Sequence, residues 1–546
     1  MPQRTEPLLA VEGLTVAFDP QQPVVNHISF TIYPGETFAL VGESGSGKSI
    51  TALSVLRLLP NNAKLNATTV NLSGDNLLER SEYDLCQIRG RRIGFIFQDP
   101  MSSLNPVMTI GNQIAEAIAI HFKLSKEELA QRTLELLRQV EIPEPEQRLK
   151  AYPHQLSGGQ RQRVMIAIAL AGQPDLLIAD EPTTSLDVTL QAQIMALLKN
   201  LQRKTGMALW FISHDLALVS TIADRVAVMQ KGQIVETGLA DDFFNAPKHP
   251  YTQKLLAALP SIHHVGNKPT NPAISATPLL QVRDFYCHYP IRKGVFKRIV
   301  DYVRAVDGVS FDIARGKTLA LVGESGCGKT TLGKSLLNLI PFGTGQVTID
   351  GIALNTLTGE TLRQQRANIQ IVFQDPFSSM NPRMLVGDIV AEGIRALQPD
   401  VTASERQQRV QQLLRQVGLP EESAWRYPHE FSGGQRQRIC IARALAVEPK
   451  LIVCDEPTSA LDVSIQQQII ALLKKLQQDK GVSYLFITHD LAVVAEIADE
   501  IAVMYQGKII EHGTAVDVLK NPQQAYTQKL LAAMPITQIH QNKSTS

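Results

Sequence analysis

Short apolar segments alternate with longer amphipathic stretches along this chain. The segments ETFALVG (36–42), RIGFIFQ (92–98), DLLIAD (175–180) and ALWFISH (208–214) are rich in apolar residues. They are too short for buried helices and are typical of parallel strands that are buried on both faces. We therefore expect an α/β fold built around a buried parallel sheet.

A different pattern interrupts this alternation. Residues 110–142 have apolar positions at helical spacing and contain no strand candidate. They lie between the sequences FQDP and SGGQ. We therefore predict a helical subdomain inserted into the α/β framework, and the second half repeats the arrangement.

The whole pattern occurs twice. LVGESGSGKS at residue 40 returns as LVGESGCGKT at residue 321, and SGGQRQR at residue 157 returns at residue 432. An internal repeat of this length decides the architecture before any motif is interpreted. Because a chain of 546 residues is also too long for one hydrophobic core, we expect two tandem domains.

The repeat also suggests boundaries. Domain 1 is expected over residues 1–260 and domain 2 over residues 279–535, followed by a C-terminal tail, 536–546. Residues 261–278 are rich in Pro, Asn, Ser and His without apolar periodicity, as is typical of a linker. The second half also carries extra residues around IRKGVFKRIVDYVRA.

Composition narrows the class of protein. The net charge of +1 gives no broad basic field of the kind that nucleic-acid binders use. No apolar run is long enough to span a membrane, and the N-terminus lacks a secretory pattern, so we expect the chain to stay in the cytoplasm. The five cysteines form no CxxC pair, which fits a reducing compartment and predicts neither a zinc site nor a disulfide.

A Gly-x-x-x-x-Gly-Lys-Ser/Thr sequence follows a predicted strand and opens a predicted helix in each half. Its glycines let backbone N–H groups surround phosphates, its lysine reaches the outer phosphates, and its hydroxyl binds Mg²⁺. The predicted phosphate-binding residues are Gly42, Glu43, Ser44, Gly45, Ser46, Gly47, Lys48, Ser49 and Ile50, and then Gly323, Glu324, Ser325, Gly326, Cys327, Gly328, Lys329, Thr330 and Thr331.

An apolar strand ends in two acidic residues in each half. They are Asp180 and Glu181 in the first half, and Asp455 and Glu456 in the second. The aspartates are predicted to hold Mg²⁺ through water, and the glutamates to polarise the attacking water. Alone, such a pair is more often a helix cap or a solvated turn, but both copies are followed by Pro-Thr and then Leu-Asp.

Two further strands end in polar residues. His214 and His489 are placed to contact a γ-phosphate or to hold the attacking water, and we predict a catalytic role for both. Gln98 and Gln374 follow another strand and are placed to touch Mg²⁺ or water. A single histidine at a strand end is usually structural, so these predictions depend on the repeated order of motifs.

A serine and two glycines open a helix in each half. Together they form a second anion site, which is redundant within a domain that already has a phosphate loop. The residues are Ser157, Gly158, Gly159 and Gln160, repeated as Ser432, Gly433, Gly434 and Gln435. Near the end of the first strand of each half, Phe18 and Tyr289 are placed to stack on adenine, with a position at the edge of the core as an equal alternative.

This ordered set of motifs resembles the nucleotide-binding domains of ATP-binding-cassette proteins, and the resemblance covers nearly the whole chain, twice. In that family two domains enclose two ATP molecules head to tail, so that the SGGQ of one half completes the site of the other. The resemblance implies a first site of Lys48, Ser49, Gln98, Asp180, Glu181 and His214 with Ser432 and Gly434. It implies a second site of Lys329, Thr330, Gln374, Asp455, Glu456 and His489 with Ser157 and Gly159. Neither set is degenerate, so two hydrolytic sites are expected.

The sequences FQDPxSS(L/M)NP, GGQRQR and HPYTQKLL resemble the oligopeptide, dipeptide and nickel importer subfamily. The tandem fusion and YPIRKGVFKRIVDY are most similar to the ATPases of Yej-type microcin C and oligopeptide importers. The resemblance implies one fused chain at the cytoplasmic face of the inner membrane. There it would energise two integral-membrane permeases that are supplied by a periplasmic substrate-binding protein. No cysteine follows Cys454, so the iron–sulfur cluster of some relatives is not expected.

Three alternatives remain open. Fused glutathione-importer ATPases share much of the pattern. A soluble translation factor with two cassettes would act on ribosomes, but it would typically have a long charged helical linker, whereas residues 261–278 are nearly uncharged. A tandem sugar importer fits the intact second site poorly. The transported substrate is not encoded in this chain, and the basic residues Arg292, Lys293, Lys297 and Arg298 are interpreted as a solvated insert, with contact to lipid or permease as the alternative.

Overall fold

The computed structural model describes residues 6–19, 21–183, 186–258, 278–293, 298–340, 343–459 and 461–534. They form two compact units. Among the described residues, the first unit contains 6–186 and 190–258, and the second contains 187–189 and 278–534. The predicted linker, apart from Pro278, and the predicted tail lie outside the described residues.

The first unit is built around a six-stranded sheet in the order β11-β10-β3-β9-β8-β7, in which only β11 runs antiparallel to its neighbour. Its strands are β3 (Thr37–Val41), β7 (Ile93–Ile96), β8 (Leu176–Asp180), β9 (Ala208–Ser213), β10 (Arg225–Gln230) and β11 (Gln233–Leu239). Every residue of β3, β8 and β9 is buried, which explains their continuous apolar sequences. The predicted α/β class is confirmed.

Different layers cover the two faces of this sheet. Ala39 and Val41 of β3 belong to a core shared with helices, whereas Phe38 and Leu40 belong to a core shared with a second, antiparallel sheet. That sheet contains β1 (Leu9–Asp19), β2 (Gln22–Ile32), β4 (Lys64–Asn66), β5 (Thr69–Leu72) and β6 (Asp75–Asn76). The central sheet is therefore buried on both sides, as its pattern predicts.

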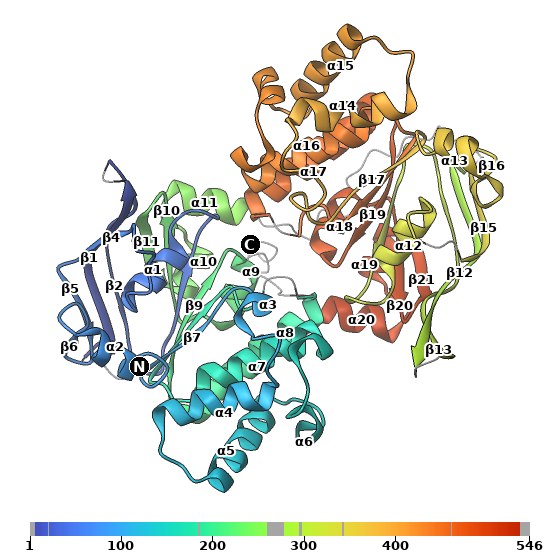
Figure 1. Ribbon diagram of the computed structural model, residues 1–546. Coiled ribbons are helices and arrows are strands. Elements are labelled where there is room, and N and C mark those ends of the chain that lie inside the picture. The colour runs from blue at the N-terminus through green and yellow to red at the C-terminus, as the bar shows by residue number, and fades with distance from the viewer. Residues whose placement is uncertain are drawn as a thin grey trace. The chain divides into compact units, whose positions relative to one another are not determined.

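The helices of the first unit include the predicted helical subdomain. Its helices α4 and α5 contribute Ile114, Ile118, Leu136 and Leu137 to the core that also contains residues of α7. Figure 1 shows α4 and α5 together at one end of this unit. The helices are α1 (Lys48–Val55), α2 (Glu82–Ile88), α3 (Pro100–Ser103), α4 (Ile110–His121), α5 (Lys126–Gln139), α6 (Pro145–Arg148), α7 (Gly158–Leu170), α8 (Val188–Thr205), α9 (Leu216–Ile222), α10 (Ala240–Asn245) and α11 (Pro250–Ala257).

The second unit repeats this plan. Its six-stranded sheet has the order β17-β18-β19-β14-β20-β21, and its antiparallel sheet has the order β13-β12-β15-β16. The strands are β12 (Leu280–Lys293), β13 (Arg298–Ile313), β14 (Thr318–Val322), β15 (Thr344–Ile349), β16 (Ile352–Ala353), β17 (Ile369–Val372), β18 (Leu451–Asp455), β19 (Ser483–Thr488), β20 (Glu500–Tyr505) and β21 (Lys508–Thr514). The helices are α12 (Lys329–Leu336), α13 (Gly359–Gln365), α14 (Val386–Leu397), α15 (Ala403–Gln416), α16 (Gly433–Leu445), α17 (Val463–Lys480), α18 (Leu491–Ile497), α19 (Ala515–Lys520) and α20 (Ala525–Ala532).

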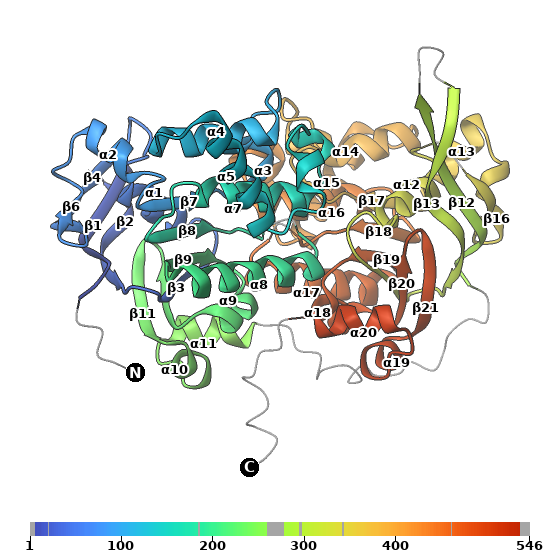
Figure 2. The ribbon, with the colours of Figure 1, turned by 90° about the horizontal axis from the view of Figure 1, so that it is seen from below.

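The extra residues of the second half lengthen one hairpin. Strands β12 and β13 contain 14 and 16 residues, whereas β1 and β2 contain 11 each. Figure 2 shows β12 and β13 side by side at the edge of their unit. Lys297 and the side chains of Arg292, Lys293 and Arg298 lie outside the described part of the chain, so the interpretation of these basic residues stays a prediction.

None of the helices that the structure describes is both long enough and apolar enough to cross a bilayer.

Candidate active sites

The phosphate loop of each half joins a buried strand to a helix. In the first half, β3 ends at Val41 and α1 begins at Lys48, with Gly47 as its N-cap at φ 103°. A Cβ on Gly42 would overlap the carbonyl oxygen of Met229, and one on Gly47 would lie 2.8 Å from that of Val24. Glycine is therefore required at both positions, because the backbone passes too close to its neighbours for any side chain.

The lysine of each loop folds back across the loop itself. Nζ of Lys48 donates hydrogen bonds to the carbonyl oxygens of Gly42 and Glu43, at 2.8 and 2.9 Å, and only 5% of the residue is exposed. Nζ of Lys329 donates to the carbonyls of Gly323 and Glu324, both at 2.8 Å. The ammonium group is thus held at the centre of the loop, which is where an outer phosphate would need it.

The hydroxyl after each lysine meets the aspartate that ends the neighbouring apolar strand. Ser49 donates to Oδ1 of Asp180 at 3.0 Å, and Thr330 donates to Oδ1 of Asp455 at 2.8 Å. Burial raises the pKa of Asp180 to about 6, and it also raises the pKa of Asp455. At each carboxyl group the effect of burial on the pKa therefore exceeds that of the neighbouring hydroxyl and lysine side chains, which favour the charged form.

These pairs fit a magnesium ion. Hydroxyl and carboxylate oxygens are the hard ligands that Mg²⁺ prefers, and it usually completes its octahedral shell with water and substrate phosphates. Among the residues that the structure describes, no group of three or more His, Cys, Asp or Glu side chains could hold a metal ion. The two oxygens at each site suit an ion that depends on the nucleotide for further ligands.

The glutamate after each aspartate lies at the centre of a polar triad. Glu181 accepts a hydrogen bond from Nε2 of Gln98 at 2.9 Å, and its other oxygen lies 2.9 Å from Nδ1 of His214. The three side chains follow β8, β7 and β9, which are adjacent parallel strands. The structure therefore brings together three residues that are far apart in the sequence.

The second half repeats the triad. Gln374 donates to Glu456 at 2.8 Å, and Nδ1 of His489 lies 3.3 Å from the other oxygen, close enough for an ion pair but not aligned for a hydrogen bond. Burial opposes charge on both groups, yet their mutual attraction outweighs it. The pKa of Glu456 is consequently lowered, and the pKa of His489 is raised.

Both central glutamates have a left-handed backbone. Glu181 has φ 47° and Glu456 has φ 46°, a conformation that costs a residue other than glycine about 1 kcal/mol. Backbone hydrogen bonds to Ile212 and Ile487, each 2.9 Å long, hold the two residues there. Strain of this kind, kept in both copies, is a common feature of functional positions.

Each SGGQ sequence caps a helix. Ser157 and Gln160 form a reciprocal capping box at the start of α7, and Ser432 and Gln435 form one at the start of α16. The serines and the glycines after them, Gly158 and Gly433, are exposed. Gly159 and Gly434 are buried, so the part of each helix N-terminus that is open to an anion is the serine and the glycine after it.

The two aromatic candidates lie on strands of the antiparallel sheets. Phe18 in β1 is 37% exposed and Tyr289 in β12 is 38% exposed, so neither is a buried core residue. Burial raises the pKa of Tyr289, while a hydrogen bond with Thr331 opposes the rise. That contact places Tyr289 next to the second phosphate loop, and contact with adenine stays a prediction for both residues.

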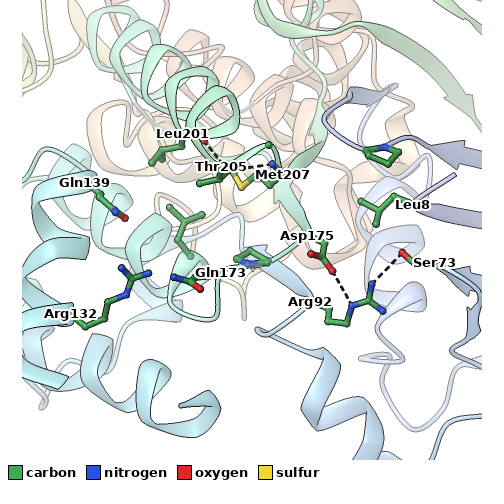
Figure 3. A pocket seen from close by; sticks show the side chains of 14 residues that line it. Leu8, Ser73, Arg92, Arg132, Gln139, Gln173, Asp175, Leu201, Thr205 and Met207 are labelled. Carbon is green, nitrogen blue, oxygen red and sulfur yellow. Dashed lines mark hydrogen bonds and ion pairs between the residues drawn. The ribbon is translucent and has the colours of Figure 1, made fainter. Parts of the chain in front are cut away.

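The first unit also contains a cavity away from its phosphate loop and its polar triad. A pocket of about 580 Å³ in the first unit is lined by residues that include Asp175 and Met207, which precede β8 and β9 (Figure 3). It therefore lies at the amino ends of the parallel strands, opposite to the triad. Its arginines are paired, since Nε of Arg92 lies 2.9 Å from Asp175 and Arg132 lies 3.5 Å from Glu135. This cavity lacks the free cationic groups that a nucleotide would need.

Sequence reasoning missed one residue at the second phosphate loop. The hydroxyl of Tyr526, on α20, accepts a hydrogen bond of 3.1 Å from the backbone N–H of Glu324. The available signal was the repeat of YTQKLL near the end of both halves, which was interpreted only as a marker of a subfamily.

Comparisons with known proteins agree with this geometry. The family model described as "ABC transporter" matches residues 25–184 and 306–459, and the model described as "Oligopeptide/dipeptide transporter, C-terminal region" matches residues 235–289 and 510–546.

Two relatives are similar along nearly the whole chain. The peptidoglycan transport ATP-binding protein YejF of Agrobacterium fabrum is 50% identical over 97% of this chain and 96% of its own length. The glutathione import ATP-binding protein GsiA of Escherichia coli K12 is 48% identical over 97% of this chain and 90% of its own length. A solved dimer of an ATP-binding cassette bound to ADP and Pi is 30% identical and covers 43% of this chain and 98% of its own, with a TM-score of 0.39. The structure has two cassettes, each with a phosphate loop and an acidic strand end, and the family matches cover both. The chain therefore belongs to the ABC transporter family, as an ATPase with two ATP-binding cassettes.

Proposed function

We propose that this chain is the ATP-hydrolysing subunit of an importer for peptides of the oligopeptide and microcin C type, at the cytoplasmic face of the inner membrane. The observation that carries the proposal is the presence of two complete polar triads in a chain that also matches the oligopeptide/dipeptide transporter C-terminal region twice. Two intact sites support an energising subunit rather than a regulatory one.

The chemistry at each site follows from the contacts. Lys48 and Lys329, together with the loop N–H groups, bind the outer phosphates of ATP. Glu181 and Glu456 accept a proton from the attacking water, while the glutamine and histidine beside each carboxylate hold it in place. Mg²⁺, bound near Ser49 and Asp180 and near Thr330 and Asp455, would neutralise charge on the phosphates.

The SGGQ sequence of each cassette is proposed to bind the ATP held by the other cassette. Each cassette already has a phosphate loop, so a second anion site has no ligand of its own within that cassette. We infer that Ser157 and Gly159 bind the ATP held by the second cassette, and that Ser432 and Gly434 bind the ATP held by the first, as the family resemblance implies. The exposed helix N-termini support this role.

The surfaces around Gln98 and Gln374 support contact with membrane permeases. Phe97, Val107 and Tyr152 are exposed large hydrophobic residues of the first half, and Val107 is 79% exposed. Phe377, Trp425 and Tyr427 are exposed large hydrophobic residues of the second half, and Tyr427 is the repeat counterpart of Tyr152. Exposed aromatic and aliphatic groups are typical of protein interfaces. Phe97 directly precedes Gln98 and Phe377 lies three residues after Gln374, so these two exposed rings give ATP binding a route to a partner.

The first experiment is purification of the tagged chain from membranes solubilised in mild detergent, with mass spectrometry of the proteins that accompany it. We expect two polytopic permeases. A matched sample from the soluble fraction serves as the control. Ribosomal proteins without a membrane partner would contradict the proposal and support the translation-factor alternative.

The choice between peptide and glutathione import needs a second step, because relatives of both kinds match. The purified complex is placed in proteoliposomes with its binding protein, and ATP hydrolysis is measured with an oligopeptide or with glutathione. Stimulation by the oligopeptide alone supports the proposal, and stimulation by glutathione alone overturns its substrate class.

A further inference from the structure

The contact between Tyr526 and the second phosphate loop joins two regions that the sequence separates. The backbone N–H of Glu324 donates a hydrogen bond of 3.1 Å to the hydroxyl of Tyr526. Tyr526 belongs to the residues that match the oligopeptide/dipeptide transporter C-terminal region. The ATP-binding loop is therefore contacted by the region that distinguishes this subfamily.

The hydrogen bond holds one peptide group of the loop from a second side. The carbonyl of Gly323 accepts from Nζ of Lys329 at 2.8 Å, and the N–H of the same peptide group, that of Glu324, donates to Tyr526. The loop is also bounded at Gly323, whose Cβ would overlap the carbonyl oxygen of Met504, and at Cys327, whose carbonyl accepts from Gly507 at 3.0 Å. Tyr526 thus supplies a contact from α20 to a loop that β20 and the turn after it already support.

Helix α20 is well placed to give a fixed contact. The backbone N–H groups of Gln523 and Gln524 donate to the carboxylate of Glu511 at 2.7 and 3.2 Å, which anchors the start of the helix to β21. Leu530 is buried in a core that contains Val322, the last residue before the loop. The ring of Tyr526 packs on that of Tyr505 with centroids 4.3 Å apart. The hydroxyl is therefore positioned before any ligand arrives.

We propose that Tyr526 is a positioning residue for ATP at the second site, through which the C-terminal region sets the conformation of the phosphate loop. The tyrosine does not touch the reacting atoms; it fixes the peptide group between Gly323 and Glu324, so that Lys329 and the loop N–H groups are preorganised for phosphate. This inference rests on the proposed role of that loop. Its consequence is that the C-terminal region and ATP influence each other at the second site.

The test uses the full chain with Tyr526→Phe, which removes the hydroxyl and keeps the ring. Binding of Mg-ATP is measured by calorimetry in a Lys48→Ala background. This change weakens binding at the first site, so that the measured affinity is that of the second site. Because the loss of one hydrogen bond is worth about 0.5–1.5 kcal/mol, we expect affinity to fall by about two- to tenfold. In a Lys329→Ala background, where the first site is reported, the same change should leave affinity unaltered.

A matched control and a second measurement separate positioning from general stability. Tyr505→Phe removes the hydroxyl of the other ring in the pair, which bonds only to Gln506 among the contacts that the structure gives it, and it should leave ATP affinity unchanged. In the otherwise unaltered chain, Tyr526→Phe should raise KM for ATP more than it changes kcat, without lowering the melting temperature of the nucleotide-free protein. Unchanged affinity, or an equal loss at both sites, overturns the inference. If the Lys329→Ala variant still binds ATP at the second site, the proposed function of that loop fails instead.

Discussion

The second glycine of the second SGGQ sequence is under a packing constraint that the sequence alone does not reveal. A Cβ on Gly434 would overlap Cγ2 of Ile465, a residue of α17. A Cβ on Gly433 would lie 3.7 Å from Leu461, which is an ordinary contact. Packing against Ile465 therefore requires glycine at position 434, whereas the space around position 433 would accept a side chain. This difference is independent of any contact with ATP.

This difference predicts that alanine is much more destabilising at Gly434 than at Gly433. Gly434→Ala should lower the free energy of unfolding by about 1–3 kcal/mol, because a methyl group is forced into a packed space. Gly433→Ala is the matched control and should cost much less. Thermal unfolding without nucleotide measures both, and Ile465→Ala combined with Gly434→Ala should be less destabilised than the sum of the two single changes. Equal melting temperatures for Gly433→Ala and Gly434→Ala would contradict the packing argument.

The left-handed backbone conformation of Glu181 and Glu456 could not be predicted from the sequence. The repeated Asp-Glu pair was enough to select Glu181 and Glu456, but nothing in a linear pattern indicates that their φ angles are positive. That conformation depends on hydrogen bonds to β9 and β19, which are distant in the sequence. Residue type is encoded locally, whereas the strained geometry comes from the sheet.

Among the elements, the lengthened hairpin is the main difference between the halves. Strands β12 and β13 pair from Leu280–Ile313 outward to Lys293–Arg298. Beyond the pair Tyr289–Val303, the described residues Ile299, Val300 and Tyr302 are exposed large hydrophobics. An extension with exposed side chains adds little to the core, so it is not needed for folding.

Shortening this hairpin should therefore be tolerated. Replacing residues 290–302 with Asn-Gly would join the paired residues Tyr289 and Val303 by a two-residue turn. We expect the melting temperature to change by no more than about 2 °C, since Ile299, Val300 and Tyr302 of the deleted part are exposed. Circular dichroism against temperature measures this, with the unaltered chain as control. A large fall in melting temperature would show that the extension packs on the rest of the unit.

Elements were easier to predict than the contacts between them. Continuous apolar sequences identified β3, β8 and β9, and helical spacing identified α4 and α5, because burial on both faces and amphipathicity leave direct signals. The contact of α20 with a phosphate loop more than 200 residues away left no such signal, although YTQKLL itself was visible. The domain boundaries, the linker and the roles of the site residues stay predictions.

At the scale of the whole molecule, the two cassettes have equivalent chemistry with small differences. Each has a buried lysine, a hydroxyl–aspartate pair and a glutamate held by a glutamine and a histidine. The differences lie around the loops, where Cys327 replaces Ser46 and Tyr505 replaces Gln230. None of these changes removes a group that contacts phosphate in the proposal, so we expect both sites to turn over.

The most direct test of this account is the number of ATP molecules bound and hydrolysed by Glu181→Gln, Glu456→Gln and the double variant. Glutamine keeps the size of the side chain but cannot accept the proton, so turnover at the altered site should fall by about 100- to 10,000-fold. Each single variant should keep two bound Mg-ATP per chain, and the double variant should bind two and hydrolyse almost none. Normal turnover in the double variant would contradict the assignment of both glutamates, and a single bound ATP would contradict the claim of two sites.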